Sequence, residues 1–335
     1  MTGPGGPVKE PDHADGPGRI GRVAVLTNPA AGAGHAEPAA RRATARLRAL
    51  GVDTASLAGG SADDTRRLAR QAVADGYDAV VVVGGDGMVN LALQAVAGTA
   101  VPLGIVPAGT GNDHAREYGL PRRSPEAAAE VIAGGHTTAV DLGRITGADG
   151  ASRWFGSVLA TGFDSLVSDR ANRLRRPRGR MRYNLAILAE FANLRPLPFR
   201  LTLADGTVIE RDLTLAAIGN TRSYGGGMII CPAADHTDGL LDLTLVAAMP
   251  RLRIARFFPS IFKGTHVHHP EVTTHRTASV RVESPGITAY ADGEFIAPLP
   301  IDVTVTRGAL HVLTPRPAAP PTMPRPGVTP SGSIS

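Results

Sequence analysis

Apolar runs of strand length alternate with stretches of helix length through the first part of the chain. Three short runs are almost wholly apolar and end in glycine or proline: residues 22–29, 79–85 and 102–107. Strands of a parallel sheet that is covered on both faces show this unbroken apolar character. Residues 53–60 indicate a further strand between the first two runs.

The segments between these runs carry the start and stop signals of helices. The segment at 61–76 opens with serine and acidic residues, places Leu68 and Val73 on one face, and closes at a glycine. Similar helical stretches precede and follow it. The resulting β-α-β-α order predicts a doubly wound, Rossmann-like α/β domain over residues 20–140.

The pattern changes after about residue 140. Short strand-like runs separated by turn residues follow, as in an antiparallel sheet, and two helical stretches, 180–194 and 251–264, interrupt them. We therefore predict a β-rich domain of the β-sandwich class over residues 141–299. The two ends, 1–19 and 316–335, are rich in proline, glycine and polar residues and are predicted to be disordered tails.

Composition narrows the class of protein. The 335 residues suffice for two domains of ordinary size. Aromatic residues make up only 4%, which argues against recognition of nucleic acid by base stacking. The net charge of +5 is carried mainly by arginine and provides a basic surface suited to phosphates or anionic lipid.

Cysteine usage and hydropathy indicate a location. The single cysteine, Cys231, allows no internal disulfide, so a reducing interior is the default. No apolar stretch reaches the ~18 residues of a membrane-spanning helix. The N-terminus lacks the apolar core of a signal peptide. We therefore expect a cytoplasmic protein.

Three glycine-rich loops follow the predicted strands, at residues 27–34, 84–90 and 107–113. In a doubly wound sheet, ligands bind beyond the carboxyl ends of the strands, so these loops should lie together. Glycines let backbone N–H groups approach an anion closely, and the N-terminus of a following helix favours negative charge. The loops match neither the Walker A pattern nor the G-x-G-x-x-G pattern. One such loop is as often a tight turn, but three at one edge predict a polyphosphate site.

Acidic residues occur in three glycine-containing loops or turns of the chain. Asp86 lies among amides that would hold phosphate, where a carboxylate is unfavourable unless it meets a metal ion, a ribose hydroxyl or a proton to be moved. The turn at 235–242 is explained more simply as an Asp-Gly hairpin; a Mg²⁺ site built from a carboxylate and carbonyls is the alternative. Asp292 and Glu294 stand two apart. In an extended turn both would point the same way, and either could act as a general base.

Together these motifs resemble the diacylglycerol kinase catalytic-domain family, in the bacterial lipid-kinase branch related to sphingosine kinases. The resemblance implies an α/β nucleotide domain and a β-rich domain, with residues 300–315 returning to the first. It implies transfer of the γ-phosphate of ATP, with Mg²⁺, to a lipid hydroxyl, above all that of diacylglycerol, to give phosphatidic acid. The stretches that carry it keep the family's order and cover nearly the whole folded chain: residues 28–34, 84–90, 107–117, 162–165, 224–242 and 291–295.

The resemblance also assigns candidate site residues. Asp238 is expected to hold a structural Mg²⁺, helped by backbone carbonyls near Asp235 and Leu240. Glu294 or Asp292 is expected to accept the proton of the lipid hydroxyl, while Asp86 holds the catalytic Mg²⁺ or orients the base. The residues expected to contact the nucleotide come from the three loops: Asn28, Pro29, Ala30, Gly32, Gly34, Gly84, Gly85, Asp86, Gly87, Met88, Asn90, Gly109, Thr110, Asn112 and Asp113.

Two positions depart from the family pattern, and three other functions stay open. Met88 replaces a threonine common in the Gly-Gly-Asp-Gly loop, which removes a hydroxyl that could bond a phosphate. His114 stands where an apolar residue is common. The alternatives are a sphingoid-base or other lipid kinase, an NAD kinase with similar loops, and a non-catalytic sensor of nucleotide or lipid. The turns at 224–242 and 291–295 favour the lipid branch over an NAD kinase, and the intact acidic residues argue against a sensor.

Two stretches could bring the chain to a membrane. Residues 169–182 carry seven arginines, each of which can contribute ~1 kcal/mol at an anionic leaflet, although a solvated loop is equally consistent. Residues 256–264 could insert aromatic side chains at the interface, although core packing is the commoner reason for such a stretch.

The expected partners follow from these features. They are a membrane lipid as substrate and an anionic membrane surface to which the protein binds peripherally, with no nucleic acid. An edge strand of the β-rich domain could pair two copies of the chain into a homodimer.

Overall fold

The computed structural model describes residues 20–28, 36–162 and 196–317. Several predicted features lie outside the described residues: the tail at 1–19, most of the tail at 316–335, the helix at 180–194 and the arginine-rich stretch at 169–182.

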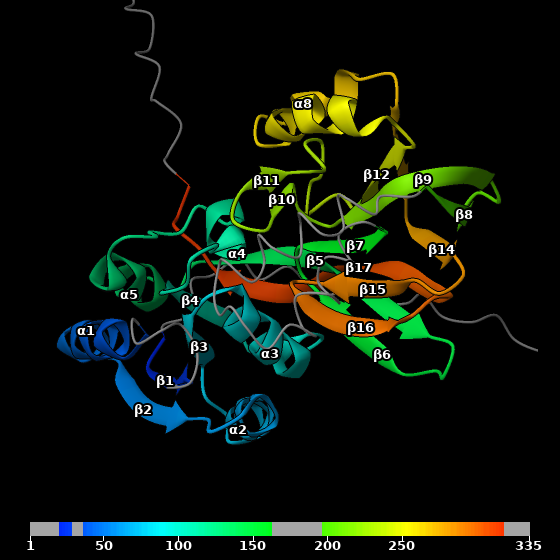
Figure 1. Cartoon of the computed structure of the whole chain (residues 1–335). Helices are drawn as coiled ribbons and strands as arrows, with labels where there is room; N and C mark the ends of the chain where they lie inside the picture. Colours follow the sequence, from blue (N-terminus) through cyan, green and yellow to red (C-terminus); the bar gives the residue numbers. More distant parts are fainter. Residues whose placement is uncertain (1–19, 29–35, 163–195, 318–335) are drawn as a thin grey trace, which may run out of the picture.

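The first half is a parallel sheet in the order β2-β1-β3-β4 with helices on both faces (Figure 1). Its strands are β1 (Arg22–Thr27), β2 (Asp53–Ala58), β3 (Ala79–Gly84) and β4 (Leu103–Pro107). Its helices are α1 (Ala36–Ala49), α2 (Ala62–Ala74), α3 (Asp86–Val96), α4 (Asp113–Glu117) and α5 (Pro125–Ala133).

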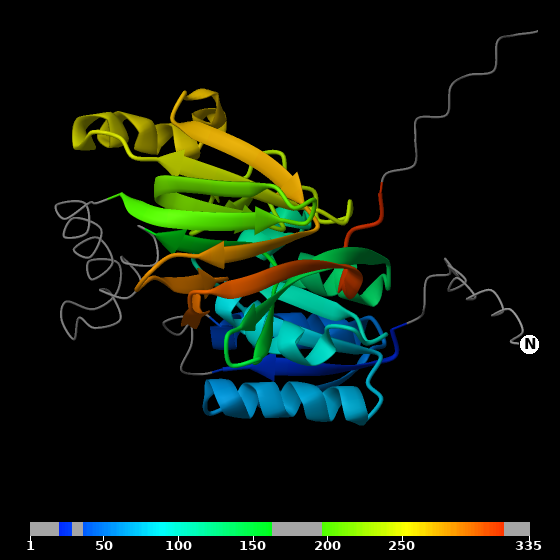
Figure 2. The same ribbon diagram turned by 90° about the vertical axis from the view of Figure 1, so that its right-hand side faces the viewer.

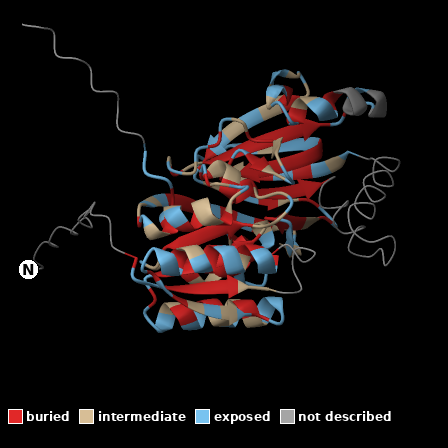
Figure 3. Cartoon of the chain, turned by 90° about the vertical axis from the view of Figure 1, so that its left-hand side faces the viewer, coloured by how far each residue is buried: buried red, intermediate tan, exposed pale blue. Residues whose placement is uncertain are grey.

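Both faces of this sheet are buried, because successive apolar residues of each strand point to opposite sides. Val81 and Val83 of β3 pack with α1 and α5, whereas Val80 and Val82 pack with α2 and α3. The inner strands β1, β3 and β4 are therefore buried along most or all of their length, whereas the edge strand β2 is mostly exposed or half-buried. The helices are exposed on their outer faces (Figure 3). This arrangement confirms the predicted doubly wound α/β class.

The second half is β-rich, as predicted. Its core cluster contains residues of strands that lie far apart in the sheet, among them Ile145 of β5 and Ala289 of β15. The sheet therefore curves so that its inner face encloses this core. Its strands are β5 (Thr137–Gly147), β6 (Ser152–Phe155), β7 (Val158–Gly162), β8 (Leu197–Leu203), β9 (Val208–Gly219), β10 (Ser223–Tyr224), β11 (Met228–Ile229), β12 (Leu241–Ala247), β13 (Val272–Thr277), β14 (Ser279–Glu283), β15 (Thr288–Ala291), β16 (Glu294–Pro298) and β17 (Ile301–Leu313).

The last strand, β17, lies between the two halves (Figures 1 and 2). It pairs antiparallel with β5 and β14, and near its end Val312 is in parallel register with Leu103 of β4. One continuous sheet therefore runs from β2 in the first half to β16 in the second.

Helix α8 (Arg251–Ile261) lies on the outer side of the β-rich half, followed by the short 3-10 helix η2 (Thr265–His268) (Figure 1). On one side of α8 the side chains of Phe257 and Ile261 are buried in the core, whereas Phe258 on the other side is 40% exposed. Within the described part of the chain, no helix combines the length and the apolar character needed to cross a membrane.

A glycine of β5 allows β6 to pack closely just before the chain enters the functional site. Gly143 of β5 stands directly opposite Phe155 of β6, and a Cβ atom added to Gly143 would lie 2.0 Å from the Phe155 ring. Phe155 is fully buried, and it is followed at once by Gly156 and Ser157, whose backbone atoms belong to that site.

We predict that Gly143→Ala lowers the free energy of unfolding by about 1–3 kcal/mol, because the added methyl group must displace a fully buried ring. Gly60→Ala is the matched control: nothing lies within 4 Å of its added Cβ, and its effect should stay within about 0.5 kcal/mol. Equilibrium denaturant unfolding measures both. Equal stability of the two variants would contradict the packing described.

Candidate functional site

Two glycine loops touch at the carboxyl edge of the parallel sheet. A Cβ atom on Gly109 would lie 2.4 Å from the Cα atom of Gly85, so neither loop leaves room for a side chain at this contact. Asn112 fixes the second loop: its Oδ1 accepts from the Gly109 N–H at 3.0 Å and its Nδ2 donates to the Gly109 carbonyl at 2.8 Å. Asn112, which sequence analysis assigned to the nucleotide, thus has its amide engaged in shaping the loop.

Asp86 is the first residue of α3 and forms a pair with a buried histidine. Its Oδ1 accepts from the backbone N–H of His114 at 3.1 Å and lies 3.2 Å from His114 Nδ1. His114 is only 1% exposed. Its other ring nitrogen, Nε2, has no hydrogen-bond partner among the described residues and lies against Gly156.

The protonation of this pair follows from its surroundings. Burial raises the pKa of Asp86, but the hydrogen bonds and charge of His114 outweigh burial, and the net pKa is lowered. Burial lowers the pKa of His114, but the Asp86 hydrogen bond and the charges of three nearby aspartates outweigh it, and the net pKa is raised. The pairing therefore favours the ionised form of Asp86 and the protonated form of His114.

Asp292 is buried, and four hydrogen bonds converge on its carboxylate. Oδ1 accepts from the N–H of Ser157 at 2.8 Å and from its hydroxyl at 2.5 Å. Oδ2 accepts from the N–H of Gly156 at 2.9 Å and from Asn90 Nδ2 at 3.0 Å. Asn90 belongs to α3, so this carboxylate joins the α/β half to the β-rich half.

Asp113 joins the halves at a second point. It lies at the start of α4, is 5% exposed, and pairs with Arg116. Its Oδ2 accepts from the N–H of Gly226 at 2.7 Å, and its Oδ1 lies 3.4 Å from the Ser223 hydroxyl. The glycine-rich turn at 224–227 is held against the loop at 107–113 in this way.

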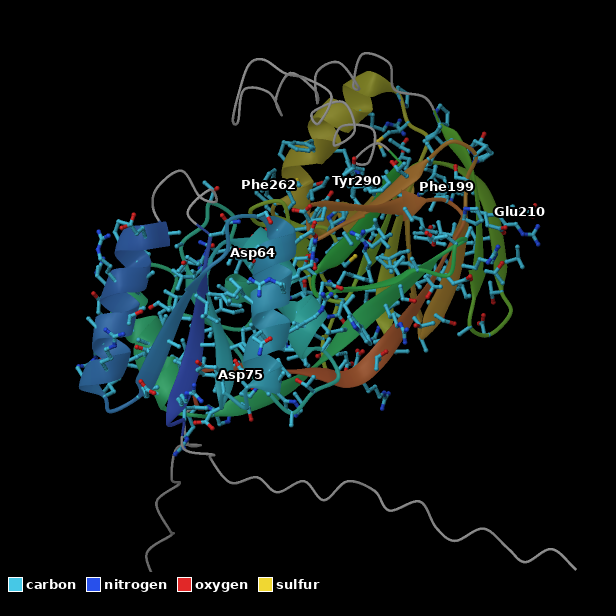
Figure 4. The ribbon with its side chains drawn as sticks, turned by 90° about the horizontal axis from the view of Figure 1, so that it is seen from below. Asp64, Asp75, Phe199, Glu210, Phe262 and Tyr290 are labelled. Carbon is cyan, nitrogen blue, oxygen red and sulfur yellow. The ribbon has the colours of Figure 1, made fainter. Side chains whose placement is uncertain are left out.

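The three aspartates line one cavity of about 550 Å³. Thr110, Gly111 and the turn at 225–226 form its polar wall, and Val158 and Ala160 of β7 contribute apolar surface. Phe262, just beyond α8, and Tyr290 of β15 also line it (Figure 4). We name this space the acidic cavity.

Glu294 lies in a different cavity, also of about 550 Å³. The sequence analysis considered that Asp292 and Glu294 would point the same way if their turn were extended. The turn is not extended: the φ angles of Asp292 and Gly293 are 51° and 82°. Glu294 therefore opens into the second space, which Arg66, Arg70 and Arg153 also line and which we name the arginine cavity.

Helix α3 stands between the two cavities. Asp86 lines the acidic cavity, whereas Asn90, one turn later, lines the arginine cavity. Gly87 lies close to the second of these, because a Cβ atom on it would be 3.9 Å from Glu294 Oε1. The Gly-Gly-Asp-Gly loop is thus flanked by carboxylates on both sides.

The remaining predicted nucleotide contacts are placed as follows. Asn28 is at the end of β1 and lines a third cavity of about 320 Å³ beside α1. Met88 is 3% exposed and packs over Gly84 in the core of the α/β half, away from the two cavities described above. Four other predicted contacts lie outside the described residues: Pro29, Ala30, Gly32 and Gly34.

Asp238, the predicted ligand of a structural Mg²⁺, has both carboxylate oxygens engaged by other groups. Asp238 Oδ2 pairs with Arg276, and Asp235 Oδ1 accepts from the backbone N–H and the hydroxyl of Thr237. Leu240 donates its own N–H to Asp238 Oδ1 at 2.9 Å. No group of three or more histidine, cysteine or acidic side chains suited to a metal occurs in the described ranges. With its oxygens engaged in this way and a guanidinium beside it, the Asp238 carboxylate does not fit the ion.

Sequence analysis overlooked three residues that build this region. Ser157 provides two of the donors to Asp292, and Arg276 pairs with the acidic turn. Asp141 of β5 is 3% exposed and accepts from the N–H groups of Gly239 and Gly308. The placement of Asp141 between the apolar residues Val140 and Leu142 is the signal that could have revealed it, because a buried carboxylate requires several donors.

Both halves of the chain match models of known protein families. Residues 22–145 match the model of the diacylglycerol kinase catalytic domain, and residues 157–314 match that of the YegS C-terminal NAD kinase beta sandwich-like domain. The chain is 58% identical over 297 residues to a diacylglycerol kinase of Mycobacterium tuberculosis, covering 89% of this chain and 96% of that protein.

Proteins that are less similar to this chain belong to the same family. A diacylglycerol kinase of Bacillus subtilis is 24% identical over 299 residues, covering 88% of this chain and 97% of that protein. The crystal structure of a putative diacylglycerol kinase from Bacillus anthracis has the same fold, with a TM-score of 0.71 at 24% identity over 88% of this chain and 97% of that one.

We predict a pH-dependent loss of stability in His114→Asn, which keeps an N–H donor near Asp86 but carries no charge. The raised pKa of His114 contributes stability that is present below its ordinary value of 6.5 and is lost as pH rises through the higher folded value. The stability gap between the wild type and the variant should therefore shrink as pH increases from about 6. Denaturant unfolding at a series of pH values measures this gap.

The Asp86→Asn background is the control for this effect. Without the carboxylate, the hydrogen bond that does most to raise the pKa of His114 is gone together with one of the three charges, so the same His114→Asn change should give a flatter gap across the series. Any loss of packing adds a constant offset at every pH. A gap in the native background that stays constant or widens with rising pH would contradict the ion pair.

Proposed function

Because the chain belongs to the diacylglycerol kinase family and is a lipid kinase, we propose that it transfers the γ-phosphate of MgATP to the hydroxyl of diacylglycerol. The products are phosphatidic acid and ADP. The observation that carries this proposal is the position of α3, whose N-terminal loop stands between the arginine cavity and the acidic cavity. A donor on one side and an acceptor on the other would meet at this loop.

The nucleotide is proposed to bind from the side of the arginine cavity. Arg70 and Arg153 provide positive charge for phosphates, whereas Arg66 pairs with Asp63, which also lines the cavity. Glu294 can accept hydrogen bonds from ribose hydroxyls or face the Mg²⁺ of the substrate. The amides of the Gly-Gly-Asp-Gly loop and the N-terminus of α3 favour the γ-phosphate at the boundary between the cavities. The side-chain-free contact between Gly85 and Gly109 suits close approach of phosphate to backbone.

The acceptor is proposed to bind in the acidic cavity. Its apolar surface from Val158, Ala160 and Phe262 suits acyl chains, and its carboxylates lie where a hydroxyl would be oriented. Phosphoryl transfer depends mainly on positioning and charge neutralisation, and a strong base is not required.

Asp86 is the best placed of the three candidate proton acceptors. Asp292 accepts four hydrogen bonds on two oxygens, which fills the lone pairs of a carboxylate, so it positions its neighbours. Glu294 opens into the other cavity. Asp86 faces the acidic cavity and is kept ionised by His114. The lipid hydroxyl gives its proton to Asp86 while the hydroxyl oxygen bonds to the γ-phosphorus. The bond between the γ-phosphorus and the oxygen that leaves with ADP breaks.

We predict that label from γ-labelled MgATP appears in phosphatidic acid when diacylglycerol is offered in mixed micelles. Asp86→Asn should lower kcat by about 10²- to 10⁴-fold, as expected for loss of a general base. Glu294→Gln should instead raise the KM for ATP. Asp149→Asn, an exposed change in the β5–β6 turn, is the control and should leave both constants unchanged.

Parallel reactions with sphingosine, monoacylglycerol and NAD distinguish the alternatives. Label in sphingosine or monoacylglycerol alone would keep the catalytic assignment and replace the acceptor. Label in NAD alone, or no transfer to any acceptor while ATP is bound, would overturn the proposed function. A normal kcat in Asp86→Asn would refute its role as the base.

We further propose that the protein docks on an anionic membrane through the end of α8. Phe258 and Phe262 are 40% and 48% exposed, and their rings contact each other edge-on with centroids 5.7 Å apart. Phe262 also lines the acidic cavity, and exposed Lys263 follows it. An apolar pair beside a cation at the cavity suits insertion at a lipid interface.

We predict that replacing both Phe258 and Phe262 by serine weakens binding to vesicles of anionic phospholipid by about tenfold, which corresponds to about 1.4 kcal/mol of lost apolar transfer. Leu50→Ser is the control, since Leu50 is 41% exposed at the end of α1 in the other half. Vesicle co-sedimentation measures the binding. If the control weakens binding as much as the double variant does, α8 is not the docking element.

A further inference from the structure

The acidic turn at 235–242 is bound by two arginines from other strands. Arg276 of β13 pairs through Nη2 with Asp238 Oδ2, and its Nε lies 3.4 Å from Asp242 Oδ2. Arg307 of β17 donates from Nη2 to the main-chain carbonyl of Asp238 at 2.8 Å. Both guanidinium groups therefore engage the oxygens of one aspartate.

The fit of Arg307 depends on the glycine of this turn. A Cβ atom added to Gly239 would lie 1.8 Å from Arg307 Nε, so the guanidinium covers bare backbone. The φ angle of Gly239 is 75°, a conformation that also favours glycine. Behind the turn, Asp141 accepts from Gly239 N–H at 2.6 Å and from Gly308 N–H at 2.8 Å.

These contacts occupy the oxygens of Asp238 that a cation would require. Asp238 Oδ1 accepts from Leu240, Oδ2 from Arg276 and the carbonyl from Arg307. Asp235 Oδ1 accepts twice from Thr237. Mg²⁺ needs oxygen ligands in near-ideal octahedral geometry and would stand beside two fixed positive charges. A guanidinium instead presents several N–H donors in a planar fork that matches such oxygens.

We infer that in this chain Arg276 and Arg307 hold the turn at 235–242 in place of a structural divalent cation. The pair acts as a clamp, because it joins the turn to β13 and β17, and Asp141 joins the same turn to β5. Both β5 and β17 belong to the seam between the two halves. Divalent cation is then required with the nucleotide and not for the fold.

The test is thermal unfolding of the full chain without nucleotide, in millimolar Mg²⁺ and in EDTA. The wild type should unfold at the same temperature in both. Arg276→Gln with Arg307→Gln should unfold several degrees lower in EDTA, and Mg²⁺ should recover part of the loss because the freed oxygens can then ligate it. Arg281→Gln is the matched control: Arg281 forms ion pairs on the same sheet, away from this turn.

A direct binding measurement keeps the inference testable even if the double variant does not fold. Titration of the nucleotide-free wild type with Mn²⁺, followed by the electron paramagnetic resonance signal of free Mn²⁺, should show no site that disappears in Asp238→Asn. A site lost in Asp238→Asn, or a lower unfolding temperature of the wild type in EDTA, would overturn the clamp. Because neither readout uses catalysis, failure here is distinct from failure of the proposed kinase reaction.

Discussion

The geometry of the site depends on one buried carboxylate. Asp292 would be costly in the interior unless its charge were met by hydrogen bonds, and its donors come from α3 on one side and the β6–β7 link on the other. The α/β half and the β-rich half can therefore satisfy this group only in one relative position. That position sets Asp86 and Asp113 around the same cavity. Asp292, one of the two residues that the resemblance offers as proton acceptor, thus also fixes the relative position of the site residues.

Much of the fold and part of the site could be predicted from the sequence. The unbroken apolar run at 79–85 and the glycines that follow it indicated both the parallel sheet and its ligand-binding edge, since burial on two faces leaves a clear pattern. The divergence of Asp292 and Glu294 could not be predicted, because it arises from a positive φ angle at an aspartate. The partners of Asp141 come from turns about 100 and 170 positions away, and no local pattern encodes them. His114 was noticed only as an unusual residue, and its pairing with Asp86 required the fold.

Two positions of the family pattern have different structural meanings in this chain. Met88, which departs from the pattern, packs into the core and leaves the loop backbone intact, so the missing hydroxyl does not by itself argue against catalysis. The acidic turn at 235–242 resembles the family's, yet arginines from other strands engage its oxygens. A motif can therefore persist while the partner that satisfies it changes, because the requirement is for compensating positive charge and not for one chemical species.

The position of β17 bears on how the molecule is assembled during synthesis. β17 follows all the other described strands in the sequence, and it pairs with β5 and β14 and reaches β4, so neither half of the sheet is complete until β17 has been made. Pairings of such large sequence separation form slowly, and unpaired strand edges invite aggregation in the meantime. The nascent protein must accordingly keep β4 and β5 without this partner while the long stretch between Gly147 and Ile301 is made. Molecular chaperones are the natural means of protecting those edges over that interval.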